Sequence, residues 1–438
     1  MRNSTETEDD IPAVLTIRRR SFGPLDPGSE AWWRAVAAEV ISGRWLAVVD
    51  ESDTVLGAGR ARPFEQAWGG RHLAMGGVAG VYVDPAARGR GAASVLMRGL
   101  LERMAGLGDA VTCLFATAPA LYRGVGYEFG GVRPRYTYAA HDLRALRALG
   151  GRLRPRPAVV ADAELVHSVM RADQVRHRLC GPRLPSVPQW REQLADEQAI
   201  HYVLDGQDGG PKGFVAYSLA DSTLTVTDLV GDSAPAAAAL WGVVASGSST
   251  APTVRAYLDP RDPVALLAGA EARHEVRQQT WMLRVVDLVK AVAGRGFAPH
   301  LTASVQVRLH DPDLPANSGT WRLDVSDGSG TATRIESDVA EGPAADAPAA
   351  DEPVADEPVA AEWSAGRGAA EWSAGRGATE WSAARGAVEM GPRGLAALWC
   401  GWSMSRLRQA GLAAGGGLDD DACLDAIFAC TPFMTEYF

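Results

Sequence analysis

Two arginines and two glycines stand together where a strand-like segment gives way to a helix-like one. The run GVYVDPAARGRGAASVL, residues 80 to 96, places Arg88, Gly89, Arg90 and Gly91 directly before the helical pattern. Glycine allows a backbone to approach a ligand closely, and the first N–H groups of a helix have no partner within that helix. The loop therefore predicts an anion site that fits a pyrophosphate. Because the run has neither G-x-G-x-x-G nor G-K-[ST], we do not expect nucleotide hydrolysis.

This loop resembles motif A of the GNAT N-acetyltransferases, R/Q-x-x-G-x-G/A, which is met by Arg88, Gly91 and Ala93. The resemblance implies that acetyl-CoA is the cosubstrate and lies on the loop. It also implies a splayed preceding strand, with backbone groups free for the pantetheine and thioester. A plain structural loop is the alternative for the motif alone. The acetyl-CoA contacts that the resemblance implies are Val81, Tyr82, Val83, Arg88, Gly89, Arg90, Gly91, Ala92, Ala93, Ser94, Thr117 and Ala118.

A second segment with chemical potential is ATAPALYRGVGYEFG, residues 116 to 130. It resembles the I-Y-G-R-F-G-Y-G motif of the enhanced intracellular survival (Eis) acetyltransferases, which residues 121 to 127 match. The resemblance gives Tyr122 the role of general acid toward the CoA sulfur. Tyr127, with a similar ring, is expected to pack in the core. Direct acetyl transfer needs no covalent enzyme intermediate, so we expect Cys113 to be a core residue as well.

The likeness to Eis extends along the chain through residues 7–22, 239–241 and 280–288, and through the ending Glu436, Tyr437, Phe438. It implies an α/β (α+β) fold of two tandem GNAT domains followed by a sterol-carrier-protein-like domain. It also implies a homohexamer.

In Eis-type enzymes the terminal carboxylate is the general base, which here assigns that role to Phe438. A free C-terminal carboxylate has a pKa of about 3.3 to 3.7 and is charged at neutral pH. Phe22 and Trp33 lie near the segment that lines the amine pocket in Eis, where aromatic faces hold a cation. Core packing of at least one aromatic residue there is the alternative. The chain departs from the family at residues 118–120, Ala-Pro-Ala, where Eis often carries Ser, Glu and Gly.

The elements that must position these residues follow from the apolar patterns. A helix is expected at residues 11–22, and a helix over the 90s carries Met97, Leu101 and Met104 on one face. The strands expected around it are 45–50 and 55–62 (a hairpin), 77–83 and 111–117. A weaker repeat of the same order has a helix at 162–176 and strands at 200–204, 214–219 and 224–230, with 281–286 closing it. The last part has strands at 303–309 and 320–325 and helices at 395–410 and 419–428.

At roughly 150 residues per domain, 438 residues predict about three domains. We place an acetyl-CoA-binding GNAT domain at 1–150, a degenerate GNAT domain at 151–294 and the sterol-carrier-like domain at 295–438. The second domain follows its strand with GDSAPAAAALW and no Arg/Gly loop, so it is expected to bind no CoA. An acidic stretch and Trp-containing nonapeptide repeats interrupt the third domain at about 336–386. We expect a poorly ordered surface loop there, with a partner-binding segment as the alternative.

Composition excludes several classes of protein. The net charge of −10 has the wrong sign for a general nucleic-acid binder, and 47% hydrophobic residues exclude wholesale disorder. Five cysteines without a C-x-x-C pair predict reduced thiols and no metal site. An acidic N-terminus and the lack of an apolar run of about 20 residues predict a cytoplasmic protein that does not enter a membrane.

Together these observations favour an acetyl-CoA-dependent N-acetyltransferase. Its acceptor would be a primary amine of an aminoglycoside-like compound, a polyamine or lysine. Two alternatives stay open: a lipid or sterol carrier in which the third domain is active, and a CoA-binding regulatory protein without turnover.

Overall fold

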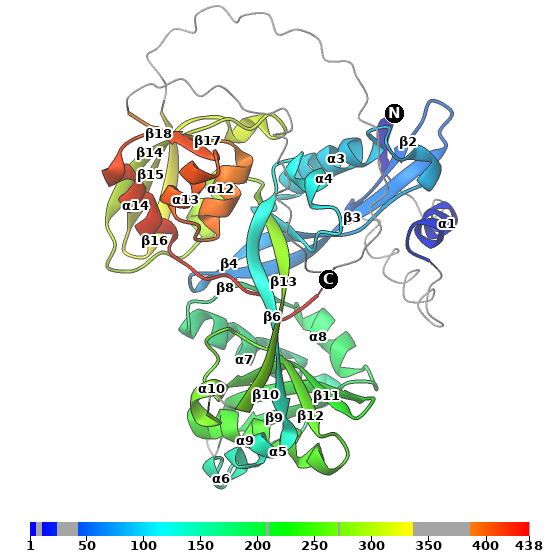
Figure 1. Ribbon diagram of the computed structural model, residues 1–438, viewed down its shortest axis with the longest axis vertical. Helices are drawn as coiled ribbons and strands as arrows, with labels where there is room; N and C mark the ends of the chain where they lie inside the picture. The colour runs from blue at the N-terminus through cyan, green and yellow to red at the C-terminus, as the bar shows by residue number, and fades with distance from the viewer. Residues whose placement is uncertain (6–10, 24–42, 207–209, 270–271, 336–385, 438) are drawn as a thin grey trace, which may run out of the picture.

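The computed structural model describes residues 1–5, 11–23, 43–206, 210–269, 272–335 and 386–437, and the elements form two sheets (Figure 1). A 13-stranded sheet has the order β1-β2-β3-β4-β5-β13-β6-β12-β11-β10-β9-β7, with β8 pairing to β3. A separate 5-stranded sheet has the order β16-β15-β14-β17-β18. The nonapeptide repeats lie outside the described residues, so the expectation for them stays a prediction.

The first unit of the long sheet carries the Arg/Gly loop. Its elements are β1 (Arg2–Thr5), α1 (Ile11–Phe22), β2 (Trp45–Val49), β3 (Val55–Trp68), β4 (Arg71–Val83), the 3₁₀ helix η2 (Pro85–Ala87), α3 (Ala92–Leu107), β5 (Val111–Leu114), α4 (Pro119–Arg123) and β6 (Glu128–Ala139). The hairpin is confirmed, since β2 and β3 pair antiparallel. The apolar face of α3 is also confirmed, because Met97, Leu101 and Met104 are fully buried against the sheet.

The second unit repeats the layout. Its elements are α5 (Ala140–Arg144), α6 (Leu146–Leu149), β7 (Arg156–Pro157), η3 (Val160–Asp162), α7 (Ala163–Arg176), β8 (Cys180–Leu184), α8 (Val187–Leu194), β9 (Ile200–Asp205), β10 (Pro211–Ala220), β11 (Thr223–Gly231), α9 (Ala234–Ala245), η4 (Ser246–Ser249), β12 (Thr253–Tyr257), α10 (Val264–Leu267) and β13 (Arg273–Val285). The predicted helix and the three predicted strands at 200–230 are confirmed.

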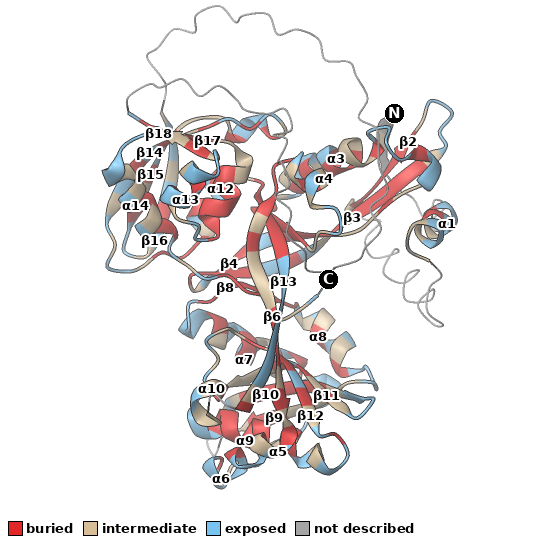
Figure 2. Ribbon diagram, in the orientation of Figure 1, coloured by how far each residue is buried: buried red, intermediate tan, exposed pale blue. Residues whose placement is uncertain are grey.

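Two long strands, β6 and β13, join the units by exchanging their ends. The end of β6, residues 135–139, pairs with β12 of the second unit. The end of β13, residues 282–285, pairs with β5 of the first unit. Figure 2 shows the consequence: β13 is exposed where it crosses between the units and is buried from Trp281 onward.

The prediction that residues 281–286 close the second unit is therefore wrong. A mostly apolar strand fits many buried positions in a sheet, so the pattern of residues 281–286, in which only the buried Arg284 is charged, does not identify the sheet that the strand enters. The predicted domain boundaries at about residues 150 and 294 stay predictions. Because β6 and β13 exchange their ends, neither the segment 1–150 nor the segment 151–294 contains all the strands of its own part of the sheet.

The third unit packs against the first. Its elements are α11 (Leu288–Gly294), β14 (Ala303–Leu309), η6 (Pro315–Asn317), β15 (Gly319–Ser326), β16 (Ser329–Ile335), β17 (Val388–Met390), α12 (Pro392–Trp399), α13 (Met404–Gln409), β18 (Ala413–Gly415) and α14 (Leu418–Phe428). The helix predicted at 395–410 is two helices, α12 and α13, because Gly401 interrupts it in the left-handed region (φ 83°).

A buried arginine connects the first and third units. The guanidinium of Arg295 lies over the rings of Trp68 in β3 and of Trp399 and Phe428 in the third unit, at 4.7–5.2 Å from their centroids. Its Nη1 donates to the Trp399 carbonyl oxygen at 2.7 Å. Cation–π contacts of this kind, shielded from water, fix the third unit on the first unit's sheet.

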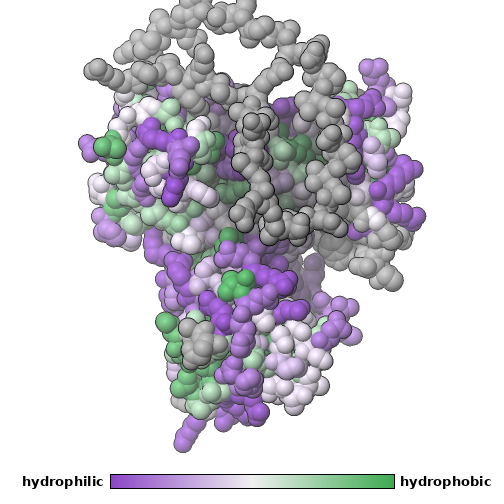
Figure 3. Space-filling view, in the orientation of Figure 1, coloured by the Kyte–Doolittle hydropathy of each residue, from purple (hydrophilic) through white to green (hydrophobic). Residues whose placement is uncertain are grey.

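On the face of the molecule seen in Figure 3, hydrophilic side chains predominate and apolar ones form small groups over the second unit. Within the described residues, no helix is long and apolar enough to cross a membrane.

Candidate active site

Two parallel strands of the first unit, β4 and β5, part where their pairing ends, and the opening between them in the sheet is called the cleft below. β4 and β5 pair from Met75↔Val111 to Gly77↔Cys113, and the pairing stops there. Beyond this point residues 78–83 of β4 pair only with β3, across an irregular register. The backbone of residues 78–83 on the side facing β5 thus lacks a strand partner. This is the splay that the family resemblance implies for the strand containing Val81 and Val83.

The side chains of this strand segment alternate between two surroundings. Val81 and Val83 lie at the edge of the cluster under α3, on the same side as the Arg/Gly loop. Tyr82 is buried on the opposite side, among Val14 and Ile17 of α1. Only the backbone of Tyr82 is therefore available as a cofactor contact.

The Arg/Gly loop leads into an open helix end. Gly89 and Gly91 have φ of 71° and 79°, in the left-handed region that favours glycine. Gly91 is the N-cap of α3 and offers no side chain, so no side-chain hydrogen bond fills the helix start. The N–H groups of Ala92, Ala93 and Ser94 are left for a ligand. A diphosphate fits this donor set, as the sequence predicts.

The charged and C-terminal members of the predicted cofactor site are exposed. Arg88 and Arg90 are solvent-exposed beside the helix start, where they add positive charge to the field of the helix dipole. Thr117 and Ala118 are exposed in the loop that follows β5 and leads to α4. The structure thus brings the predicted strand, loop and helix residues to one edge of the sheet.

Tyr122 lies in the short helix α4 next to this edge. Its side chain is 7% exposed and belongs to the cluster under α3. Among the described residues its hydroxyl has no hydrogen-bond partner. Burial, and secondarily the neighbouring Tyr437, raises the pKa of Tyr122, so the phenol keeps its proton at neutral pH. A protonated phenol without an internal acceptor suits proton donation.

Tyr127 and Cys113 are core residues. The Tyr127 ring is fully buried, packs edge-on against Tyr122 at 6.1 Å and shares a 3.1 Å hydrogen bond with the Thr112 hydroxyl. Cys113 is fully buried beside Gln66, and this burial raises the pKa of its thiol well above the usual value. Neither group reaches the cleft in a reactive form.

The C-terminal segment, residues 432–437, leaves the third unit and runs past β6, between the first and second units (Figure 1). Its backbone is held on both sides, since Met434 N donates to the Val132 carbonyl at 2.9 Å and Phe433 N donates to the Cys180 carbonyl at 3.1 Å. Gly181 permits this close approach, because a Cβ there would lie 2.3 Å from the Phe433 oxygen.

The end of this segment reaches the strand that borders the cleft. The Tyr437 ring stacks on Phe115, one residue beyond β5, with centroids 4.7 Å apart. Arg133 Nε donates to the Thr435 carbonyl at 2.9 Å. These contacts were not predictable, because Arg133 and Phe115 carry no local motif and meet the tail only in three dimensions. Phe438 and Trp33 lie outside the described residues, as does the side chain of Phe22, so their roles stay predictions.

The second unit has the same strand pair but a different helix start. β11 and β12 are parallel and pair from Thr223↔Thr253 to Val226↔Ala256. At the start of α9 the Ser233 hydroxyl accepts a hydrogen bond from Ala236 N, and Pro235 in the first turn lacks an N–H. The helix end that is open in α3 is capped in α9, and the expectation that this unit binds no CoA stays a prediction.

Comparisons with known proteins agree with this arrangement. A GNAT acetyltransferase domain model matches residues 3–130, a second matches residues 186–285, and a sterol carrier protein domain model matches residues 288–349. The chain is 26% identical over 359 residues, 73% of its length and 82% of the relative's, to an uncharacterized N-acetyltransferase of Streptomyces avermitilis. GNAT domains generally use acetyl-CoA.

Solved structures have the same fold over the full length of the chain. A GCN5-related N-acetyltransferase from Kribbella flavida is 37% identical, with a TM-score of 0.84 over 100% of this chain and 98% of that one. Eis1 from Mycobacterium abscessus is 21% identical and shares the fold over 100% of both chains, with a TM-score of 0.68. The chain belongs to the GCN5-related N-acetyltransferase family and is an acyltransferase with two GNAT domains and a sterol-carrier-type domain, the architecture of Eis.

Proposed function

We propose that this enzyme transfers the acetyl group of acetyl-CoA to a primary amine in the cleft between β4 and β5. The acceptor is an aminoglycoside-like compound, a polyamine or a lysine side chain. The observation that carries the proposal is the meeting of the C-terminal tail with this cleft. Tyr437 stacks on Phe115 directly after β5, and its effect on the pKa of Tyr122 reflects how near the two phenols lie.

The Arg/Gly loop and the splayed end of β4 form the proposed acetyl-CoA site, which is called the cofactor seat below. The N–H groups at the start of α3 and the side chains of Arg88 and Arg90 hold the diphosphate. The backbone of residues 81–83, which has no strand partner on the side facing β5, faces the acyl end and polarises its carbonyl. Acetyl-CoA supplies an activated acyl group, so no enzyme nucleophile is needed.

Two groups of this chain move the protons. The terminal carboxylate of Phe438 accepts a proton from the ammonium group of the acceptor, through water, and leaves a neutral amine. The amine nitrogen forms a bond to the acyl carbon while the carbon–sulfur bond breaks, and the nitrogen then releases its second proton to solvent to leave the amide. Tyr122 donates its proton to the departing sulfur and regains one from solvent. The hexamer and the cytoplasmic location implied above belong to the same proposal.

The test is release of free CoA thiol from acetyl-CoA across a panel of amines, using protein that ends at Phe438 and protein extended by a few residues after Phe438. We expect release with at least one amine. Extension should lower kcat by about 100-fold, the typical contribution of acid–base catalysis, and leave the KM for acetyl-CoA within about twofold. Unchanged kcat would remove Phe438 from the mechanism. Binding of acetyl-CoA without release for any amine would favour the carrier or the regulatory protein.

A further inference from the structure

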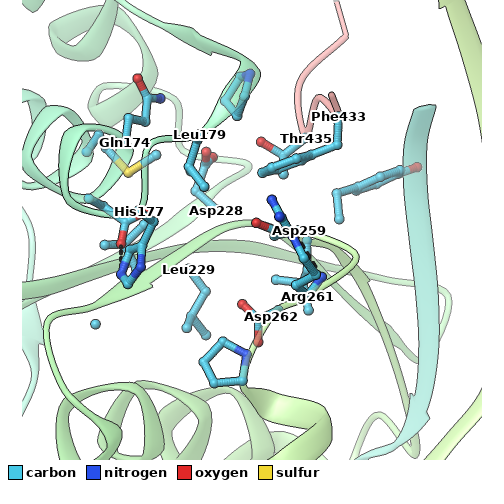
Figure 4. A pocket seen from close by; sticks show the side chains of 18 of the residues that line it. Gln174, His177, Leu179, Asp228, Leu229, Asp259, Arg261, Asp262, Phe433 and Thr435 are labelled. Atoms are coloured by element: carbon cyan, nitrogen blue, oxygen red, sulfur yellow. Dashed lines mark hydrogen bonds and ion pairs between the residues drawn. The ribbon is translucent and has the colours of Figure 1, made fainter. Parts of the chain in front are cut away.

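The second unit encloses a cavity of about 350 Å³ beside the C-terminal tail (Figure 4). Its walls come from α7, from the end of β11, from the loop after β12 and from tail residues 433–436. None of these residues belongs to the cofactor seat described above. The acetyl-transfer reaction does not account for this cavity.

The cavity is the second unit's counterpart of the acetyl-CoA cleft. β11 and β12 stop pairing after Val226↔Ala256. Beyond this point residues 228–231 of β11 diverge from residues 257–259, at and just after the end of β12, and both segments line the cavity. The same strand splay forms the cleft between β4 and β5, so the fold provides an equivalent space in both units.

The chemistry of this second space is opposite to that of the first. Its walls carry the carboxylates of Asp173, Asp228, Asp259, Asp262 and Glu436. The basic lining side chains are His177 and Arg261. His177 Nε2 lies 3.5 Å from Asp173, and Arg261 Nε lies 3.4 Å from Asp259, so each is offset by an acid. With both of these pairs counted as charged, Asp228, Asp262 and Glu436 have no basic partner among the lining side chains, an arrangement that favours a cation over an anion.

Asp228 is the acid that most directly indicates a cationic ligand. The residue is 9% exposed, points into the cavity in Figure 4 and makes no ion pair with any described residue. Burial, together with Glu436, raises its pKa to about 7 against smaller opposing effects of Thr227, Arg183 and Arg133. Burial likewise raises the pKa of Asp262 to about 7. Burial disfavours the ionised form of these carboxylates, and a positive charge that enters the cavity beside them stabilises that form.

The arrangement of the acids selects the kind of cation. In the part of the chain that the structure describes, no three His, Cys, Asp or Glu side chains converge closely enough to share one metal ion. The carboxylates are instead distributed around the cavity on several elements. A flexible molecule with two or more separated ammonium groups can meet several of them at once, and 350 Å³ is within the range of small-molecule sites.

We propose that this cavity binds an aliphatic polyamine, at a site separate from the acetyl-transfer cleft. Asp228 and Asp262 are its principal counter-charges. Phe433, Thr435 and Glu436 form one wall, and the tail continues from them to Tyr437 on Phe115. A polyamine bound here therefore holds the tail in place. Binding itself does not depend on the proposed acetyl transfer; only the effect on the tail does.

The test is calorimetric titration of the full-length protein with spermidine at about pH 8, in the presence of saturating CoA and without acetyl-CoA. The double variant Asp228→Asn/Asp262→Asn should bind at least tenfold more weakly. Glu197→Gln removes an exposed acid of the same unit that lies outside the cavity, and it should bind within twofold of the parent protein. A matched titration with MgCl₂ should give no comparable heat.

The proposal fails if spermidine gives no heat, if the double variant binds as tightly as the parent, or if Mg²⁺ binds equally well at these residues. CoA titration of the double variant checks that it is folded. Absence of spermidine binding would leave acetyl transfer unaffected, and absence of acetyl transfer would leave a positive titration standing. The two proposals can therefore fail separately.

Discussion

The two splayed strand pairs of the long sheet have the same backbone frame and opposite chemistry. In the first unit the helix start is open, with Gly91 as its cap, and arginines flank it. In the second unit Ser233 caps the helix start, and aspartates line the space between the strands. The first arrangement favours a diphosphate and the second favours a cation. The fold supplies the cleft, and a few side chains decide what it binds.

The tail adds a further difference. It closes one side of the acidic cavity through residues 433–436, and its end lies against the first cleft at Phe115. One segment of chain thus contributes to both spaces. The proposed difference between the two clefts can be tested by substitutions in each cleft.

The largest expected effect is at the proposed general acid of the first cleft. Tyr122→Phe should lower kcat by about 100-fold or more, because the departing sulfur loses its proton donor, and should leave acetyl-CoA affinity within about twofold. Tyr127→Phe is the matched control. It removes the hydrogen bond to Thr112, worth about 1 kcal/mol of unfolding free energy, with little change in kcat. Steady-state kinetics and thermal unfolding measure both, and equal kcat losses would contradict the assignment.

A second test asks whether the open helix start is what distinguishes the first cleft. Gly91→Ala and Gly108→Ala place a side chain at the two ends of α3, where φ is 79° and 88° and a Cβ would meet no atom within 4 Å. Each substitution should lower the unfolding free energy by about 1–2 kcal/mol through left-handed strain.

Only Gly91→Ala should weaken CoA binding, by about tenfold, because the strained loop presents its N–H groups less favourably to the diphosphate. Equilibrium binding of CoA to the two variants measures this difference. Equal affinities would mean that the loop is not the diphosphate seat.

The smallest expected effect concerns the buried acid of the second cleft. The pKa of Asp228 is raised from 3.8 to about 7, so between these values the folded protein retains a proton that the unfolded chain has released. This contribution to stability is complete below about pH 4 and is lost as the pH rises toward 7. Asp228→Asn should therefore reduce the fall in stability between about pH 5 and 8, by on the order of 1–2 kcal/mol.

Urea unfolding of polyamine-free protein at several pH values measures this slope. Glu197→Gln, with its exposed carboxylate, should leave the slope unchanged. If Asp228→Asn has the same slope as the parent protein, Asp228 does not carry the raised pKa.

The sequence by itself determined the local parts of the first cleft. The Arg/Gly loop and the apolar face of α3 depend on residue types and spacings within about 20 positions, which is the range over which helix periodicity and turn chemistry act. The family architecture was readable for the same reason, since its motifs are contiguous. The short helix α4 that carries Tyr122 was not predicted, since a strand was expected to run to residue 117.

Tertiary structure alone decided which distant segments share a surface. The buried end of β13, in which Arg284 stands among apolar residues, pairs with β5 of the first unit, and its local pattern does not identify that partner. The tail meets Phe115, and Asp228 meets Asp262 around one cavity, although about 320 and 30 residues separate the members of these pairs. Sequence patterns report which face of an element is buried, whereas the partner of that face is fixed by long-range packing. The charge of the second cleft and the path of the tail are properties of that packing.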